Sequence, residues 1–263
     1  MTTMLYPLRD SATMLRRNLL HVKRYPSMTV QLIGTPIVLL LLFVYVFGGT
    51  MGAGLPGAAG GRAEYLGYII PGIMLMTAAT VAQGTAISVS MDMTEGIVAR
   101  FRTMSISRGA IFAGHVLGST IQSVTSVAVV VGVAALLGYR PDTNGFGWLG
   151  ALGVMALAAF ALAWITTALG VVSKNIETAS SLPMPLMMLP FLGSGFVPTE
   201  SMPTGLRWFA EYQPFTPMME SLRGFLTGQP DATATWFTVA WCLGLSLVGY
   251  LWSRNRFDRA SSI

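Results

Sequence analysis

The residues that could perform covalent or metal chemistry are few in this sequence and stand far apart. The chain has two histidines, His21 and His115, and one cysteine, Cys242. Neither of its lysines, Lys23 and Lys174, follows a GxxxxG stretch, so the chain lacks the loop that cradles nucleotide phosphates. No HExxH pair, Ser/His/Asp set or pair of acids suited to a metal occurs in it. We therefore expect no catalytic residue, no metal site and no cofactor bound by this chain.

The stretch from residue 92 to residue 108 has the most informative pattern of charges. Asp92 and Glu95 come first. Arg100 and Arg102 follow, and a helix macrodipole favours this order of charges. Apolar residues recur between the charges at helical spacing: Met93, Ile97, Phe101 and Met104. We predict a short amphipathic helix that begins at Asp92, within residues 91–109, and docks a partner protein. A helix that packs only on this chain is the alternative.

The N-terminal segment, residues 1–27, carries a second amphipathic pattern. Five apolar residues fall on one narrow helical stripe: Leu8, Ala12, Leu15, Leu19 and Val22. We expect a helix that lies in the cytoplasmic membrane interface before the chain turns at Tyr25 and Pro26. A cleaved signal peptide is the alternative, and its removal would leave one crossing fewer.

The helices that position these residues can be predicted from the long stretches of sequence that carry no charge. The chain has 263 residues, 53% of them hydrophobic, with 16 Lys and Arg and 11 Asp and Glu, whereas a soluble domain is about one quarter charged. Six stretches of at least 22 residues carry no charge, and roughly 20 apolar residues span a bilayer as a helix. The sequence predicts one all-α polytopic membrane domain over residues 1–263, which excludes a soluble enzyme, a disordered chain and a nucleic-acid module. The six spans are predicted at about residues 28–47, 68–91, 110–137, 148–172, 180–197 and 235–252.

The positive charges give the spans a direction, because Lys and Arg in short flanking loops stay cytoplasmic. Twelve of the 16 lie in the N-terminal segment, the second and fourth connections and the C-terminus, and four lie in the other connections. We therefore expect a bacterial plasma-membrane protein with both termini in the cytoplasm. The basic pI then reflects topology and attraction to membrane lipid, and we expect no nucleic-acid partner.

The fifth predicted span contains three prolines, at positions 183, 185 and 190. Proline in a bilayer helix frees backbone carbonyls, and transporters often form binding sites at interrupted helices. The candidates for the substrate path are Met74, Met184, Met187, Met188 and Phe191. A kinked helix packed for shape alone is the alternative.

The external segment, residues 198–231, alternates prolines with apolar and charged stretches. This pattern predicts short interfacial or re-entrant helices before the last span. The candidates for an external gate are Tyr212, Phe215, Met218, Glu220 and Arg223. Aromatic residues that only anchor the chain at the interface are the alternative.

Ion coupling would need ionisable residues inside the spans. The sequence places no acid well inside any predicted span, so we interpret His115 as a structural hydrogen-bonding group. We likewise interpret Gln31, Gln83 and Gln122 as links between helices. An ion-coupled carrier or channel is therefore the less favoured class.

The whole chain resembles the ABC-2 type exporter permeases, and in particular their daunorubicin-resistance type. The resemblance rests on DMTEGIVARFRTMSISRGAIFAGHVLG after the second span and EYQPFTPMMESLRGFLTG before the sixth. It implies the permease subunit of an ATP-binding cassette exporter that moves a hydrophobic or amphiphilic compound out of the cytoplasm or inner leaflet. An exporter of a lipid-linked glycan is the alternative.

The resemblance also implies partners. Two ATP-binding cassette subunits would bind and hydrolyse ATP with Mg, and a second, identical permease chain would complete the assembly. Residues 91–109 would be the coupling helix on the ATPase, and the N-terminal helix would lie beside it. The docking residues implied are Asp92, Glu95, Ile97, Arg100, Phe101 and Arg102, with Arg16 and Arg17.

Overall fold

The structure is a computed structural model that describes residue 15 and residues 26–53, 61–94 and 108–259. Within these ranges the chain forms helices joined by turns, and they contain no strand. The described part therefore has the all-α fold that the sequence predicts.

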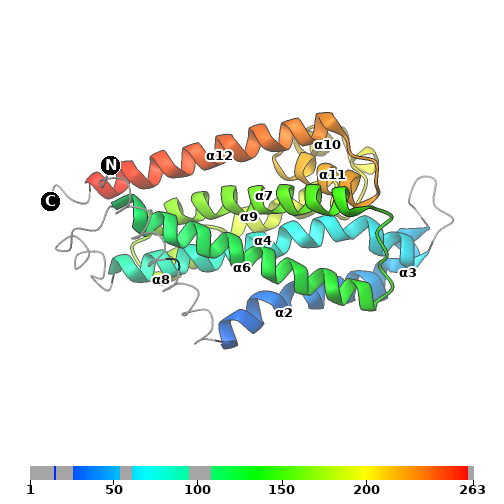
Figure 1. Cartoon of the computed structure of the whole chain (residues 1–263), viewed down its shortest axis with the longest axis horizontal. Coiled ribbons are helices and arrows are strands. Elements are labelled where there is room, and N and C mark those ends of the chain that lie inside the picture. Colours follow the sequence, from blue (N-terminus) through cyan, green and yellow to red (C-terminus); the bar gives the residue numbers. More distant parts are fainter. Residues whose placement is uncertain (1–14, 16–25, 54–60, 95–107, 260–263) are drawn as a thin grey trace.

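Five long helical stretches run along the molecule (Figure 1). The first is continuous through three elements: α2 (Pro26–Leu42), the π-helix η1 (Phe43–Phe47) and α3 (Gly48–Gly52). The other four are α4 (Arg62–Thr94), α6 (Arg108–Leu136), α7 (Gly145–Val172) and α12 (Ala232–Arg259). Each stretch is long and apolar enough to cross a membrane. They coincide with five of the six predicted spans.

The two ends of the bundle gather different connections (Figure 1). One end, called here the α8 end, holds α8 (Ile176–Ser181), the last turns of α4 and α12 and the first turns of α6. The opposite end, the α11 end, holds α3, α10 (Thr204–Tyr212) and α11 (Phe215–Leu226). Connections that the charges place on the same side of a membrane thus lie at the same end.

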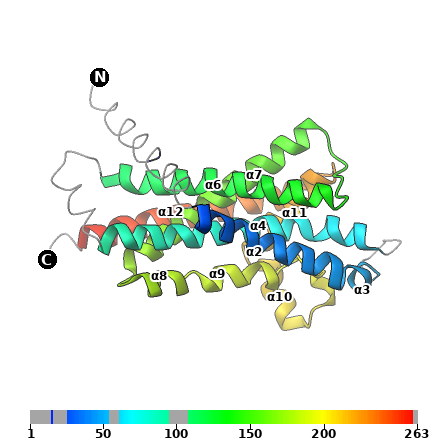
Figure 2. The ribbon, with the colours of Figure 1, turned by 90° about the horizontal axis from the view of Figure 1, so that it is seen from below.

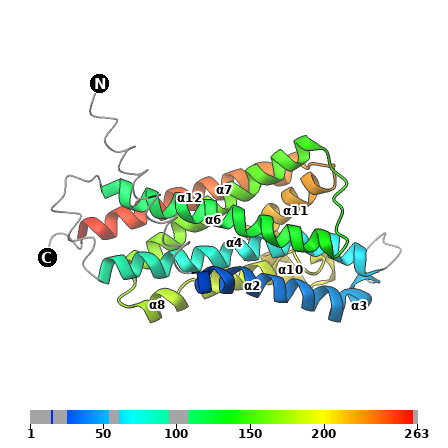
Figure 3. The same ribbon diagram turned by 60° about the horizontal axis from the view of Figure 1, so that its bottom comes forward.

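Helix α4 is the central helix of the bundle. It packs on α2, α6, α7 and α8, and Figure 3 shows it running between α6 and α2. Every residue of α4 from 69 to 82 is buried. By contrast, α2 and α12 expose large apolar side chains such as Val30, Trp236 and Leu243. Such outer faces suit a hydrocarbon environment, where apolar side chains meet lipid tails.

Two close approaches between backbones depend on glycine. A Cβ on Gly249 of α12 would lie 2.6 Å from the backbone carbonyl carbon of Trp164 on α7. A Cβ on Gly72 of α4 would lie 2.9 Å from the carbonyl oxygen of Gly195. Small residues allow membrane helices to pack at such short separations.

The stretch predicted as the fifth span is not one helix. After α8 come α9 (Met184–Met188) and the 3-10 turn η2 (Leu189–Leu192). The three prolines explain the interruptions, because each lacks the N–H that an α-helical ladder needs and its ring crowds the preceding turn. Figure 2 shows α8 and α9 following one another along the bundle before the chain reaches α10. The interruption that the prolines indicated is therefore present, and a crossing at residues 180–197 stays a prediction; we call residues 176–197 the broken segment.

The short helices predicted before the last span are present. A 3-10 turn, η3 (Thr199–Ser201), leads into α10 and then α11. Eight of the twelve residues of α11 are buried, including Phe215 and Met218. Helix α11 is therefore part of the packed bundle rather than a loosely attached surface helix.

Candidate functional site

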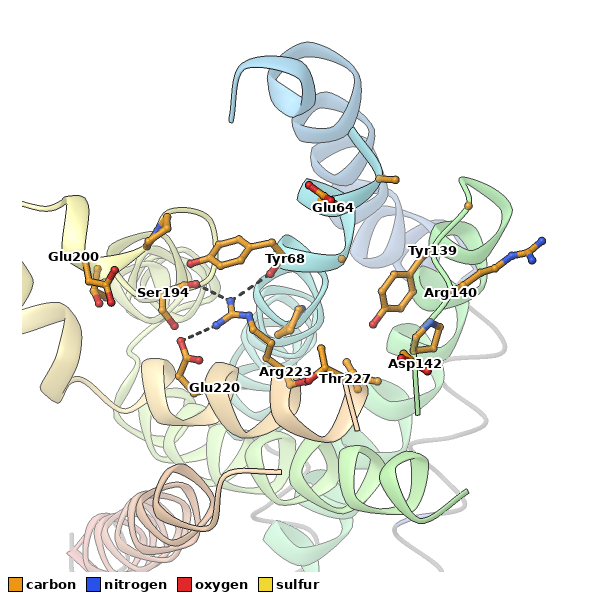
Figure 4. Close-up of a pocket in the computed structure, with 18 residues that line it drawn as sticks. Glu64, Tyr68, Tyr139, Arg140, Asp142, Ser194, Glu200, Glu220, Arg223 and Thr227 are labelled. Atoms are coloured by element: carbon orange, nitrogen blue, oxygen red, sulfur yellow. Dashed lines mark hydrogen bonds and ion pairs between the residues drawn. The ribbon is translucent and has the colours of Figure 1, made fainter. Parts of the chain in front are cut away.

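A cavity of about 850 Å³ opens at the α11 end (Figure 4). Its walls come from the first turns of α4, the turn at residues 138–142, residues 194–200 and α11. It therefore lies where two long helices, the broken segment and a short helix meet.

Arg223 of α11 stands at the centre of this cavity (Figure 4). Its Nη1 donates to Oε1 of Glu220 at 2.6 Å. Its Nη2 donates to the carbonyl oxygens of Ser194 at 2.9 Å and Tyr68 at 3.3 Å. The guanidinium also lies 4.2 Å from the centroid of the Tyr68 ring, which attracts a cation electrostatically. One side chain thus joins α11, α4 and the broken segment.

The cavity wall combines apolar surface with charged side chains, and among these the acids outnumber the bases. Its acidic residues are Glu64, Asp142, Glu200 and Glu220, and its basic residues are Arg140 and Arg223. Tyr139 also lines the wall, and burial raises the pKa of its phenol to about 12. Its phenol O–H can donate and accept a hydrogen bond. Such a wall suits the polar part of an amphiphilic molecule.

Three long polar side chains hold carbonyl groups of the broken segment. Nε2 of Gln83 on α4 donates to the carbonyl oxygen of Ser180 at 2.7 Å. Nε2 of Gln213, between α10 and α11, donates to that of Leu189 at 3.0 Å. Arg223 binds the third carbonyl, as described above. These bonds satisfy carbonyl groups of a segment that does not continue as one helix, and the bond from Gln83 to Ser180 confirms the interpretation of Gln83 as a link between helices.

The five gate candidates do not all reach a cavity. Glu220 and Arg223 line the main cavity, and with Tyr212 they line a second one of about 610 Å³ between α10, α11 and α12. Phe215 and Met218 are instead buried in the core, at 1% and 0% exposure. Glu220 and Arg223 are therefore the pair that the geometry places between the two cavities.

The substrate-path candidates differ in their burial and in their neighbours. Met74 is buried in the hydrophobic core, and Met187 is partly buried and packs against that core. Met184 and Met188 are more than half exposed. Phe191 stacks on Phe196, with ring centroids 4.7 Å apart. No candidate lines either of the two cavities described above, so a shared substrate path through them stays a prediction.

An aromatic cluster joins the first helical stretch to the broken segment. Phe43 lies 4.8 Å from Phe196 and 6.4 Å from Phe191, measured between ring centroids. Phe43 opens the π-helix η1, and π-helical turns often occur at functional positions in α-helices. The two irregular stretches of the bundle are thus in direct contact.

At the α8 end the structure corrects two expectations. Asp92 does not begin a helix, because α4 continues to Thr94. Its side chain is buried, and its Oδ2 lies 3.0 Å from Nε2 of His115. His115 therefore has an acidic partner near the end of α4, which the sequence did not predict, and it is a hydrogen-bonding group as expected. A buried position also removes Asp92 from a protein-docking surface.

The other docking candidates lie outside the described residues. These are Glu95, Ile97, Arg100, Phe101 and Arg102 and, in the N-terminal segment, Arg16 and Arg17. Their role stays a prediction.

Sequence reasoning missed Tyr68, Ser194 and Gln213 as parts of the site. The sequence pattern indicates Tyr68 as the start of the second span and gives no sign of a role in the site. Gln213 had one usable signal, since a glutamine next to Pro214 separates two apolar stretches. Ser194 contributes a backbone carbonyl, so its residue type gave no signal.

A bundle of long apolar helices with a polar cavity at one end, in a chain without a nucleotide-binding loop, is typical of the membrane subunit of a transporter. The ABC-2 type transporter family matches residues 10–227. The chain belongs to this family, which confirms the resemblance seen in the sequence.

Two relatives illustrate the match. The daunorubicin resistance ABC transporter permease protein DrrB1 of Streptomyces coeruleorubidus is 30% identical over 217 residues, covering 82% of this chain and 74% of the relative. The probable doxorubicin resistance ABC transporter permease protein DrrC of Mycobacterium tuberculosis is 24% identical over 180 residues, covering 68% of this chain and 65% of the relative. Both relatives are permease proteins of drug-resistance ABC transporters by name.

Proposed function

We propose that this chain is the membrane-spanning subunit of an ATP-driven exporter for a hydrophobic or amphiphilic compound. The observation that carries the proposal is the family match over residues 10–227, which spans four of the long helical stretches and the polar cavity. A separate ATP-binding cassette subunit hydrolyses ATP with Mg, because this chain lacks the loop that binds nucleotide phosphates.

The proposed topology has six crossings, with the broken segment as the fifth. The α8 end is cytoplasmic in this arrangement. Its support is the balance of charge among the described residues, which is +2 at this end and −2 at the α11 end, as the positive-inside rule requires. The bases at the α8 end are Arg108, Lys174, Arg254, Arg256 and Arg259, against three acids, whereas the α11 end has four bases and six acids. The α11 end, with its polar cavity, then faces outward from a bacterial plasma membrane.

The proposed assembly contains two permease chains of this sequence and two ATPase subunits. Residues 95–107, with Glu95, Arg100 and Arg102 as polar contacts, rest on the ATPase. Ile97 and Phe101 supply the apolar part of this contact, and the N-terminal helix with Arg16 and Arg17 lies beside it.

In this scheme the compound leaves through the α11 end. Arg223 and Glu220 act as an external gate, because both line the two cavities and Arg223 ties α11 to α4 through the Tyr68 carbonyl. Export of a lipid-linked glycan remains the alternative substrate class. An ion-coupled carrier is disfavoured, because the buried part of α4 from residue 69 to residue 82 contains no acid.

The test is co-purification with an ATP-binding cassette ATPase subunit from the same organism, followed by ATP hydrolysis measured in lipid. Reversing charge at Arg100→Glu together with Arg102→Glu should abolish co-purification, because the polar contacts turn repulsive. The matched control is Arg254→Glu with Arg256→Glu, which makes the same charge change at exposed positions of α12. Equal binding by both double variants would contradict the docking proposal.

A further inference from the structure

The buried pair of Asp92 and His115 lies where α4 ends and α6 begins. We propose that this pair is a positioning element that fixes the separation of the two helices leading into and out of residues 95–107. It thereby sets how motion of a bound ATPase is passed to the bundle. The inference rests on the proposed function, since it takes residues 95–107 as the ATPase contact.

The two side chains of the pair are buried and within hydrogen-bond distance. Oδ2 of Asp92 and Nε2 of His115 are 3.0 Å apart, and the residues are 8% and 7% exposed. Which of the two donates is set by the tautomer of the imidazole. Removing one partner of a buried hydrogen bond costs the desolvation penalty of the group that remains.

Two side-chain hydrogen bonds link α4 and α6, and we call them the outer and the inner rung. The pair of Asp92 and His115 is the outer rung, which lies nearer the helix ends. The inner rung is a hydrogen bond of 2.7 Å from Oγ1 of Thr85 to Oγ of Ser119. Thr85 precedes Asp92 by two helical turns, and Ser119 follows His115 by about one. The two rungs thus fix both the separation and the register of the antiparallel helices close to residues 95–107.

The two hydrogen bonds differ in whether the remaining side chain still has a partner after the bond is removed. The hydroxyl of Thr85 has the carbonyl oxygen of Val81, 3.4 Å away, as an alternative acceptor, so it keeps a partner without Ser119. Loss of the imidazole instead leaves a buried carboxylate without one of its partners, which is far more unfavourable than losing a neutral bond. The outer rung is therefore the one whose removal should shift the helices.

Apolar packing next to the pair holds it against a third helix. Phe112 and Val116 of α6 cluster with Ala163 and Trp164 of α7, and Met93 packs against the same cluster. Residues on both sides of His115, and the residue that follows Asp92, are thus anchored. A displacement of one helix end is therefore transmitted to the other rather than absorbed by loose side chains.

The experiment compares Asp92→Ala, His115→Ala, the double variant and, as a matched control, Ser119→Ala. Dipolar EPR reports the distance between spin labels at Thr94 and Leu117, both exposed, in a chain with Cys242→Ser. The complex with the ATPase in liposomes gives the transport of rhodamine 6G per ATP hydrolysed. We expect each pair variant to broaden the distance distribution and to lower transport per ATP on the order of tenfold. The double variant should lose no more than either single one, and Ser119→Ala should match the wild type.

A variant with Asp92→Asn separates positioning from folding. Its amide oxygen still accepts from His115 and leaves no buried charge, so we expect a narrow distance distribution and near-normal coupling. The proposal is overturned if the pair variants keep both properties, if Ser119→Ala loses as much, or if Asp92→Asn folds but is uncoupled. If the wild-type chain binds no ATPase, the proposed function fails, while the EPR distances still test the pair.

Discussion

Replacing Arg223 with methionine removes the guanidinium group at the α11 end and keeps an unbranched side chain. A hydrogen bond to a charged group contributes about 1.5–3 kcal/mol, and the bond to the Ser194 carbonyl at 2.9 Å belongs to this class. The stacking of the guanidinium on Tyr68 adds about 1 kcal/mol. The pair with Glu220, whose side chain is 41% exposed, adds at most about 1 kcal/mol because water screens it. Since one side chain makes all these contacts, we expect a total loss of about 3 kcal/mol in the free energy of unfolding.

The assay is thermal unfolding of the purified protein in detergent, followed by the fluorescence of its six tryptophans. A loss of this size should lower Tm by roughly 6–12 °C in a chain of this length. The matched control is Arg207→Met on α10. Its ion pair with Glu211 has the same 2.6 Å separation, but the two side chains are 47% and 40% exposed. We expect no measurable change in Tm for the control, because exposed pairs contribute little.

A second variant, Arg223→Lys, tests the geometry rather than the charge. An ammonium group is a compact point charge and cannot reproduce the planar fork that reaches Glu220 and two carbonyls at once. We expect a drop in Tm between those of the wild type and Arg223→Met. Equal Tm values for Arg223→Met and Arg207→Met would refute the reasoning that burial and the carbonyl contacts make Arg223 structurally important.

Two further predictions follow from packing and exposure. Gly249→Ala should destabilise the protein by about 1–3 kcal/mol, because its Cβ would press on the backbone of Trp164. The control is Gly244→Ala on the same helix, whose Cβ would meet nothing within 4 Å, so this variant should be neutral or slightly stabilising. Thermal unfolding compares the two variants. Met188→Trp, at a position 53% exposed, should change which compounds stimulate ATP hydrolysis while leaving Tm unaltered; an unchanged stimulation profile would remove Met188 from the substrate path.

The long helices could be predicted from the sequence because a bilayer leaves few alternatives. A stretch without charge and long enough to span can satisfy its backbone groups only as a helix. The predicted starts and ends lie within about three residues of those of α4, α6, α7 and α12, except that α4 begins six residues before its predicted span and α12 continues beyond its own to Arg259. That extension carries Arg254 and Arg256, and a helix can continue into water after it has left the hydrocarbon.

The pairings across the bundle could not be predicted in the same way. Asp92 followed by Glu95 has the spacing of a capping box, which suggested a helix start, yet packing on α6 keeps residues 92–94 within α4. His115 lies 23 positions away from Asp92, and only the relative register of two helices brings them together. The prolines indicated a break in the fifth span, but they gave no sign that Gln83, Gln213 and Arg223 would bind the carbonyls there.

These separate contacts share one helix. Helix α4 presents Tyr68 to Arg223 at the α11 end, Gln83 to the broken segment in its middle, and Asp92 to His115 at the α8 end. Residues 68 and 92 are about 36 Å apart along an α-helix, since each residue advances it by about 1.5 Å. The buried length between them cannot bend independently of the core, because α2, α6 and α7 pack on it. A displacement of α4 at the Asp92 end is therefore carried to the cavity around Arg223 by the helix itself, through contacts that each have a single-residue test.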